Sequence, residues 1–116
     1  MSMAKSVTFA DHELLRFGEA VFHAHGLTPT DARLVADGLV ESDLRGLPSH
    51  GVARIPIYAE RLRRGLVKPQ PDIVVKRVTP VAASVDGDDG MGFIVGKRAM
   101  EEAVAMAREF GLGLVG

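Results

Sequence analysis

The sequence predicts an α+β fold, in which an N-terminal bundle of three helices precedes the first strands and one helix of a larger sheet domain. Three observations lead to this prediction. Apolar residues recur at helical spacing in the first half of the chain, a proline-rich linker follows, and short β-branched runs begin beyond it. We therefore expect a helical region over residues 1–68 and an incomplete sheet region over residues 69–116.

Composition excludes several classes of protein. The 116 residues are 47% hydrophobic and 25% charged, as in ordinary soluble globular domains. A net charge of -1 attracts neither nucleic acid nor an anionic membrane. The absence of cysteine excludes a disulfide scaffold, a thiolate zinc site and a cysteine nucleophile. No apolar run approaches the ~18 residues of a membrane span, and residues 1–5 do not resemble a signal peptide, so we expect a cytoplasmic protein.

The first helix is expected to have Thr8 as its N-cap, with Asp11 three residues later, and to stop at Gly26. Its helical spacing predicts one buried stripe along its length. The stripe comprises Leu14, Phe17, Val21 and Ala24, widened by Leu15 and Phe22.

The second helix has clearer start signals. Thr28 is expected at the N-cap, Pro29 at the first helical position and Asp31 at the third, and Gly46 is expected to end the helix. Its predicted buried face consists of Leu34, Val35, Leu39 and Val40.

A third helix is predicted after a short break at residues 47–51, ending at Gly65. Pro56 must lie in its first turn or kink it, because proline cannot donate the backbone hydrogen bond. The residues that keep the helical period are Val52, Ile55, Tyr58, Ala59 and Leu62.

The second half of the chain changes to β-type chemistry after the linker at residues 68–71. Two strands are predicted at residues 73–75 and 81–85, followed by a turn at 86–92 and a helix at 94–110. The buried stripe of that helix is expected to be Ile94, Met100, Val104 and Ala107. Residues 111–116 begin another strand with no partner after it, so we expect the remaining strands of the sheet to be missing here.

The strongest candidate site is the stretch 43–54, which contains Ser49, His50 and Arg54. If the third helix begins near Ser49, His50 and Arg54 are four residues apart and share one face. An imidazole transfers protons at neutral pH, and a guanidinium binds a carboxylate through two parallel hydrogen bonds. Together they suit a substrate with a carboxylate beside a carbonyl or imine, to which Ser49 adds a hydrogen bond. The alternative is that Ser49 only caps the helix and His50 bonds locally.

Other motifs are weaker. The glycines of residues 90–96 follow a strand and open a helix, but they depart from the dinucleotide pattern, and three aspartates crowd the place of a pyrophosphate. The same turn fails as a calcium loop, because Gly90 offers no ligand at the fifth position and Lys97 stands where the bidentate glutamate belongs.

The remaining histidines and the local basic patch predict no site. We expect no metal site among His12, His23 and His25, because the last two point in different directions on a helix. A solvated helix end, rather than a nucleic-acid footprint, is expected for the four basic residues Arg61, Arg63, Arg64 and Lys68.

The stretches 43–46 and 49–54, followed by Tyr58 and Arg61-Leu62, resemble the N-terminal signature of the malate/L-lactate dehydrogenase-like oxidoreductases. The turn at 86–92 and the segments 98–100 and 111–113 continue the resemblance in the right order. This family includes ureidoglycolate and sulfolactate dehydrogenases and reductases of cyclic imino acids. The sequence resembles only the N-terminal portion of the family.

The resemblance implies NAD- or NADP-dependent interconversion of a 2-oxo acid, or a cyclic ketimine carboxylate, and the 2-hydroxy or cyclic imino acid. His50 matches the family's proposed proton donor and acceptor, and Ser49 and Arg54 match its neighbours in the substrate pocket. The resemblance also implies a non-Rossmann cofactor domain, and homodimers with the nicotinamide site between subunits. Because the family's later segments are missing, we expect this chain alone to be inactive.

Two readings compete with the enzyme. One is a non-catalytic helical interaction module, or half of a split enzyme that needs a second chain. The other is a small Rossmann-type nucleotide binder, which requires this chain alone to bind NAD(P)H at residues 90–96.

Overall fold

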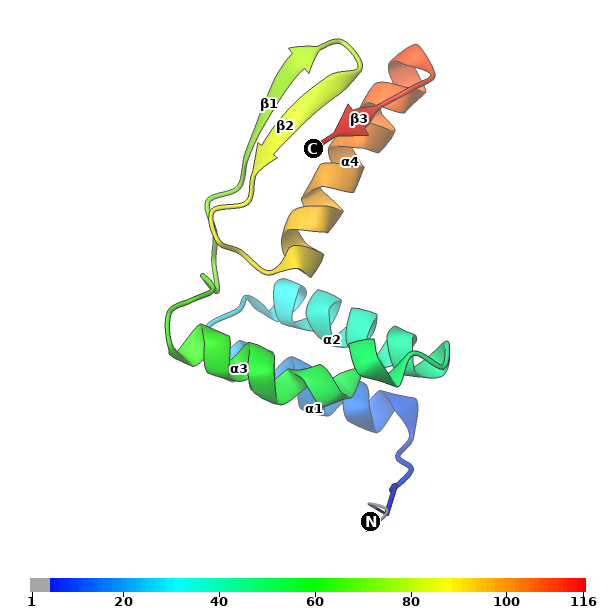
Figure 1. The fold of residues 1–116 in the computed structure, drawn as a ribbon, viewed down its shortest axis with the longest axis vertical. Coiled ribbons are helices and arrows are strands. Elements are labelled where there is room, and N and C mark those ends of the chain that lie inside the picture. The colour runs from blue at the N-terminus through cyan, green and yellow to red at the C-terminus, as the bar shows by residue number, and fades with distance from the viewer. Residues whose placement is uncertain (1–4) are drawn as a thin grey trace.

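The computed structural model describes residues 5–116 and has an α+β fold, which confirms the predicted fold class (Figure 1). Three helices lie side by side at one end of the molecule, and a small sheet with the fourth helix forms the other end. The helices are α1 (Asp11–Ala24), α2 (Pro29–Leu44), α3 (Ile55–Arg63) and α4 (Gly92–Phe110). The strands are β1 (Val74–Thr79), β2 (Ala82–Asp86) and β3 (Leu114–Val115).

Helix α1 begins at Asp11 with Ala10 as its N-cap, so the prediction that Thr8 caps it is wrong. Thr8 lies two residues before the N-cap, and no side chain caps the first turn. The carbonyl of Ala10 instead accepts the amides of Glu13 and Leu14, at 3.1 and 3.3 Å. The acidic side chains of Asp11 and Glu13 lie in the first turn, where they interact favourably with the positive end of the helix dipole.

The buried face of α1 is rotated relative to the predicted stripe. Gly18 and Phe22 are buried, whereas Phe17 is 59% exposed. The cause is the close approach of α1 and α2 at Gly18, where an added Cβ would stand 3.1 Å from Cβ of Ala36. A glycine contributes no apolar side chain to a periodic pattern, yet it determines which face of the helix can touch its neighbour.

Helix α2 begins as predicted. The side-chain oxygen of Thr28 accepts the amide of Asp31 at 3.2 Å, and Pro29 occupies the first turn. After the helix, Gly46 has a φ of +76°, a conformation that glycine adopts without strain. The buried residues of α2 are Ala32, Val35, Ala36, Leu39 and Val40, and they place this helix in the centre of the helical region.

The third predicted helix is shorter than expected. Two 3-10 turns, Pro48–His50 and Val52–Arg54, precede α3, which begins at Ile55. Gly51 separates the two turns in an extended conformation. Pro56 lies in the first turn of α3, one of the two positions that the sequence allows.

The sheet has the order β1-β2-β3. Strands β1 and β2 are antiparallel, with Val75 opposite Val85 and an irregularity between Arg77 and Thr79. Strand β3 is parallel to β2, with Ala82 opposite Leu114. The strand expected in residues 111–116 is thus present as β3, and β1 extends further than the predicted residues 73–75.

Helix α4 packs on the sheet with a different face from the predicted one. Ile94 and Met106 are buried, but Met100 is 63% and Val104 40% exposed. An added Cβ on Gly113, just before β3, would overlap the backbone carbonyl of Ala103. This close approach sets which side of α4 faces the strands.

One core joins the two ends of the molecule. It runs from Phe22 and Leu39 of the helical region to Met91 and Ile94 at the start of α4. Gly38 in α2 leaves room for the ring of Phe93, which an added Cβ would overlap. The core therefore crosses the boundary between residues 68 and 69. No helix within residues 5–116 is long and apolar enough to cross a membrane.

Candidate functional site

Ser49, His50 and Arg54 lie in the two 3-10 turns between α2 and α3. The amide of His50 donates to the carbonyl of Leu47 at 3.0 Å, and the amide of Arg54 donates to the carbonyl of Gly51 at 3.0 Å. The expectation that a continuous helix from Ser49 places His50 and Arg54 on one face is therefore wrong. Extended Gly51 interrupts the helical path between them.

Asp43, in the last turn of α2, anchors this loop. Its Oδ2 accepts the backbone amide of Val52 at 2.8 Å. Gly51 is buried against the same carboxylate, and an added Cβ there would overlap it. Because Asp43 belongs to a helix that is itself packed in the core, the loop takes its position from α2.

The three candidate side chains are connected through Ser49. Its hydroxyl lies 2.8 Å from Nδ1 of His50, within hydrogen-bond distance. Its backbone carbonyl accepts the Nε hydrogen of Arg54 at 2.7 Å. All three residues are exposed, and within residues 5–116 neither Nε2 of His50 nor the terminal nitrogens of Arg54 have a hydrogen-bond partner.

This arrangement has a clear chemical capacity. The hydrogen bond at Nδ1 orients the imidazole of His50 and leaves its Nε2 available for another partner. Arg54, held by its Nε, presents two further nitrogens that suit a carboxylate. A side chain that can transfer a proton and a cation that suits a carboxylate are thus both hydrogen-bonded to Ser49.

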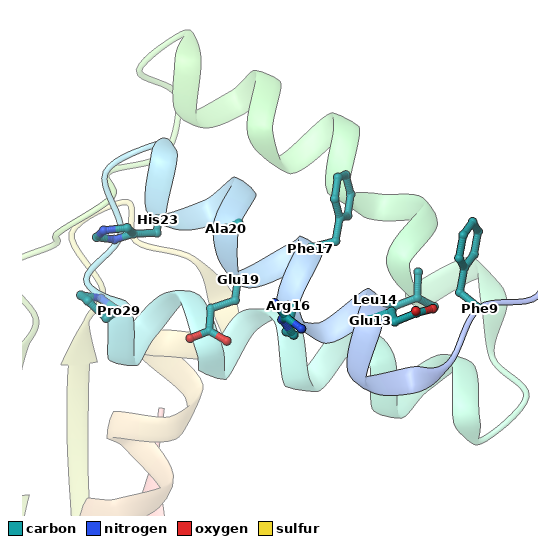
Figure 2. A pocket seen from close by; sticks show the side chains of 9 residues that line it. All are labelled: Phe9, Glu13, Leu14, Arg16, Phe17, Glu19, Ala20, His23 and Pro29. Carbon is teal, nitrogen blue, oxygen red and sulfur yellow. The ribbon is translucent and has the colours of Figure 1, made fainter.

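A separate groove lies along α1. It has a volume of about 920 Å³ and contains none of the three candidate residues. Phe9 and Phe17 project toward the same side of it in Figure 2, and the charged residues Glu13, Arg16 and Glu19 also line it. This groove carries both signs of charge, and Nδ1 of His23, which also lines it, lies 2.9 Å from the carbonyl of Leu27.

A second cavity of about 510 Å³ lies between α3 and the turn that leads into α4. Among residues 5–116, Arg61 is the one charged residue that lines it, and Tyr58 contributes the one side-chain hydroxyl. The other lining residues are Val67, Gly90, Met91, Gly92 and Phe93.

The basic residues expected at the solvated helix end differ in their partners. Arg63 forms a salt bridge with Glu60 at 2.6 Å, and Lys68 forms one with Asp88 at 2.5 Å. Hydrogen bonding to Arg63 lowers the pKa of the Glu60 carboxyl, and hydrogen bonding to Lys68 lowers that of Asp88. Arg61, in contrast, has no salt bridge within residues 5–116 and lines the second cavity.

The aspartates of the turn at 86–92 support the turn itself. Asp88 accepts the amide of Asp72 at 2.9 Å in addition to its bond with Lys68. Asp86 accepts the amide of Asp88, also at 2.9 Å. Asp88 and Asp89 both have positive φ, at 50° and 56°, which aspartate tolerates better than most residues.

The histidines of α1 make local hydrogen bonds. Nδ1 of His23 lies 2.9 Å from the carbonyl of Leu27, and Nδ1 of His25 lies 2.8 Å from that of Val21. In the part of the chain that the structure describes, no three histidine or acidic side chains gather closely enough to hold a metal ion.

Sequence reasoning missed the anchoring role of Asp43 and the cavity at Tyr58 and Arg61. Asp43 is nine residues from its partner Val52, and no local pattern predicts such a pairing. For the cavity a signal exists, since Tyr58 and Arg61 are three residues apart on one helix and share a face.

Comparison with known proteins gives consistent matches. The family model described as malate/L-lactate dehydrogenase matches residues 9–116. An L-sulfolactate dehydrogenase of Methanocaldococcus jannaschii is 42% identical over 95 residues, which are 82% of this chain and 28% of that protein. A malate dehydrogenase of Pyrococcus abyssi is 41% identical over 103 residues, which are 89% of this chain and 28% of that protein.

Solved structures agree with these matches. The malate dehydrogenase of Pyrococcus horikoshii superimposes with a TM-score of 0.91 at 39% identity, covering 94% of this chain and 31% of that one. The chain thus spans less than a third of the length of each of these three relatives.

Proposed function

The chain belongs to the malate/L-lactate dehydrogenase family, and on this premise we propose that it forms the substrate side of an NAD(P)H-dependent oxidoreductase. The reaction interconverts a 2-oxo acid and the 2-hydroxy acid, or a cyclic ketimine carboxylate and the cyclic imino acid. One observation carries the proposal. Arg54, Ser49 and His50 form a connected series of hydrogen bonds, and within residues 5–116 neither Nε2 of His50 nor the terminal nitrogens of Arg54 have a partner.

In the proposed reaction, Arg54 binds the carboxylate of the substrate through its two terminal nitrogens. This holds the adjacent carbonyl, or imine, close to Nε2 of His50. When bound, the nicotinamide supplies a hydride to the carbon of that group. Nε2 of His50 gives its proton to the heteroatom, so that the product is a neutral hydroxyl or amine. Ser49 accepts a hydrogen bond from Nδ1 of His50 both before and after this transfer, because the proton that leaves is the one on Nε2.

The residues present fit a dinucleotide beside this site. The second cavity opens one to two turns along α3 from Arg54, and its lining includes a cation and no acid. An acidic lining would repel the phosphates of the cofactor.

We also propose a division of the chain into two regions. Residues 1–68 form the substrate-side helical bundle, and residues 69–116 begin a non-Rossmann cofactor domain, which polypeptide outside this chain completes. We place the complete enzyme in the cytoplasm as a homodimer. The exposure of Ser49, His50 and Arg54 supports a site that further polypeptide covers, because a hydride transfer site needs walls that exclude water.

The test is an assay of NADH and NADPH oxidation by the protein that contains this chain. Oxaloacetate, pyruvate, sulfopyruvate and a cyclic ketimine carboxylate serve as substrates, and a simple ketone without a carboxylate is the control. Oxidation with at least one acid, and none with the ketone, is expected. A folded protein that oxidises neither dinucleotide with any of these acids contradicts the proposal.

The alternative function is a helical interaction module without catalysis. The apolar groove along α1 favours it, because Phe9 and Phe17 are 56% and 59% exposed there. An interaction module binds no dinucleotide, so the absence of NADH and NADPH binding in a fluorescence titration would favour this reading over the enzyme.

A further inference from the structure

We propose that the cavity between α3 and residues 90–93 binds a phosphate group of the dinucleotide, with Arg61 as the residue that contacts it. This inference rests on the proposed function and adds to it a site for the cofactor. Tyr58 is the second polar side chain of the cavity and offers a hydroxyl donor to the same anion.

The cavity is built on the core of the protein. Tyr58, Val67 and Phe93 are partly buried and pack against the central hydrophobic cluster, and Met91 is 6% exposed. An added Cβ on Gly92 would meet no atom within 4 Å, so the absence of a side chain there leaves the cavity open. Its walls therefore do not depend on a loose loop.

The charge of the cavity favours an anion. Arg61 lines it, and no acidic residue does. The neighbouring basic residues Arg63 and Lys68 are already paired with Glu60 and Asp88. In the described part of the chain, the guanidinium of Arg61 has neither a hydrogen bond nor a salt bridge, unlike that of Arg63, and five donors remain for a ligand.

The position of the cavity relative to Arg54 indicates which ligand brings the anion. Arg54 is the N-cap residue of α3, and Tyr58 and Arg61, three residues apart within the helix, share one of its faces. Seven residues of helix place Arg61 roughly 10 Å along the axis from Arg54. A small oxo acid that is held at Arg54 does not also reach Arg61. A dinucleotide does, because a ribose separates its nicotinamide from its phosphates.

The contrast with the groove along α1 supports the same assignment. That groove is larger, but Glu13 and Glu19 line it together with Arg16. Carboxylates at these positions would repel a phosphate, whereas the lining of the smaller cavity contains no such group.

The test compares Arg61→Ala with Arg64→Ala in the same protein. Both variants remove one exposed arginine near the end of α3, but only Arg61 lines the cavity. Dissociation constants of NADH and NADPH are measured by fluorescence titration, and that of inorganic pyrophosphate by calorimetry. We expect Arg61→Ala to weaken the binding of all three by roughly 10-fold or more, because a charge-assisted hydrogen bond is lost. Arg64→Ala is expected to bind like the wild type.

Two further variants make the result independent of folding. Arg61→Lys keeps the charge and is expected to restore part of the affinity. Gly92→Val places a side chain in the open cavity and is expected to weaken dinucleotide binding without removing a charge. Equal affinities for Arg61→Ala and Arg64→Ala would overturn the inference.

The outcomes also separate this inference from the proposed function. If Arg61→Ala weakens dinucleotide binding but the wild type reduces no oxo acid, the cavity assignment stands and the proposed reaction fails. If the wild type reduces an oxo acid, and Arg61→Ala raises only the KM of that acid, the cavity binds the substrate and the inference is wrong.

Discussion

The carboxylate of Asp43 accepts the backbone amide of Val52 at 2.8 Å, and through this contact a helix positions the loop that carries the candidate site. Asp43 lies in the last turn of α2, and Val52 begins the second 3-10 turn. His50 and Arg54 stand two residues to either side of Val52. The position of the candidate site therefore depends on Asp43, a residue that itself carries out no chemistry.

The first prediction concerns Asp43→Ala. Removing the carboxylate leaves the amide of Val52 without its acceptor, and we expect the free energy of unfolding to fall by about 1–3 kcal/mol. Urea denaturation measures the change. Glu41→Ala is the matched control, because it breaks only an exposed ion pair with Arg45 and is expected to cost less than about 1 kcal/mol. Equal losses in the two variants would show that Asp43 does not anchor the loop.

The second prediction concerns Gly51→Ala. The added methyl group would overlap the Asp43 carboxylate and push the loop away from α2. In the active enzyme, kcat/KM is expected to fall by roughly 10²-fold, because a shift of about 1 Å in a catalytic group has an effect of that size. Gly96→Ala is the control, since a Cβ there meets nothing within 4 Å, and the variant should be more stable by up to about 1 kcal/mol. Unchanged kcat/KM in Gly51→Ala contradicts the positioning argument.

The third prediction concerns Arg54→Lys. Lysine loses both the Nε contact with the carbonyl of Ser49 and the planar pair of nitrogens that suits a carboxylate. The KM of the oxo acid is expected to rise by roughly 10-fold or more, while the dissociation constant of the dinucleotide stays the same. Arg64→Lys, at the opposite end of α3, provides the comparison. An unchanged KM in Arg54→Lys excludes a bidentate contact with the substrate.

The fourth prediction concerns the pH dependence of the turn at 86–92. Hydrogen bonding to Lys68 lowers the pKa of Asp88 from its ordinary value of 3.8, and the bond to Asp88 raises the pKa of Lys68 from 10.5. Because its pKa is lowered, the Asp88 carboxylate stabilises the fold above pH 3.8, and this contribution is lost as the pH falls through the lowered pKa. The Lys68 ammonium shows the opposite pH dependence: its contribution to stability is present below pH 10.5 and is lost as the pH rises through the raised pKa.

Asp88→Asn tests this pair, because asparagine also tolerates the positive φ at this position. The stability difference between wild type and Asp88→Asn should be constant around neutral pH and shrink below about pH 4. Urea denaturation along an acid series measures it. A difference that stays constant down to about pH 2 would rule out the ion pair as its source.

Local signals predicted much of the fold. Helix α2 begins as expected because Thr28, Pro29 and Asp31 determine the start among themselves. Long-range contacts caused the errors. The buried face of α1 depends on the close approach of Gly18 to Ala36. The buried face of α4 depends on the close approach of Gly113 to Ala103. Glycines have no side chain, so they add no signal to a hydrophobic pattern.

For the candidate site, residue types were more informative than spacing. An imidazole and a guanidinium that are close in sequence indicate a site at Ser49, His50 and Arg54. Their actual connection runs through both the hydroxyl and the backbone carbonyl of Ser49, in a pair of 3-10 turns. The anchor at Asp43 is a tertiary contact across nine residues, which helical periodicity does not reveal. The roles of the three residues stay predictions until they are measured.

The most direct measurement is the steady-state kinetics of His50→Gln and His50→Ala in NAD(P)H-dependent reduction of the preferred oxo acid. If His50 donates the proton, kcat falls by about 10²-fold or more in both variants, and the dissociation constant of the dinucleotide is unchanged. His12→Ala, an exposed histidine outside the site, retains the wild-type rate. Near-normal kcat in the His50 variants would contradict the account, because the proton would then come from another group.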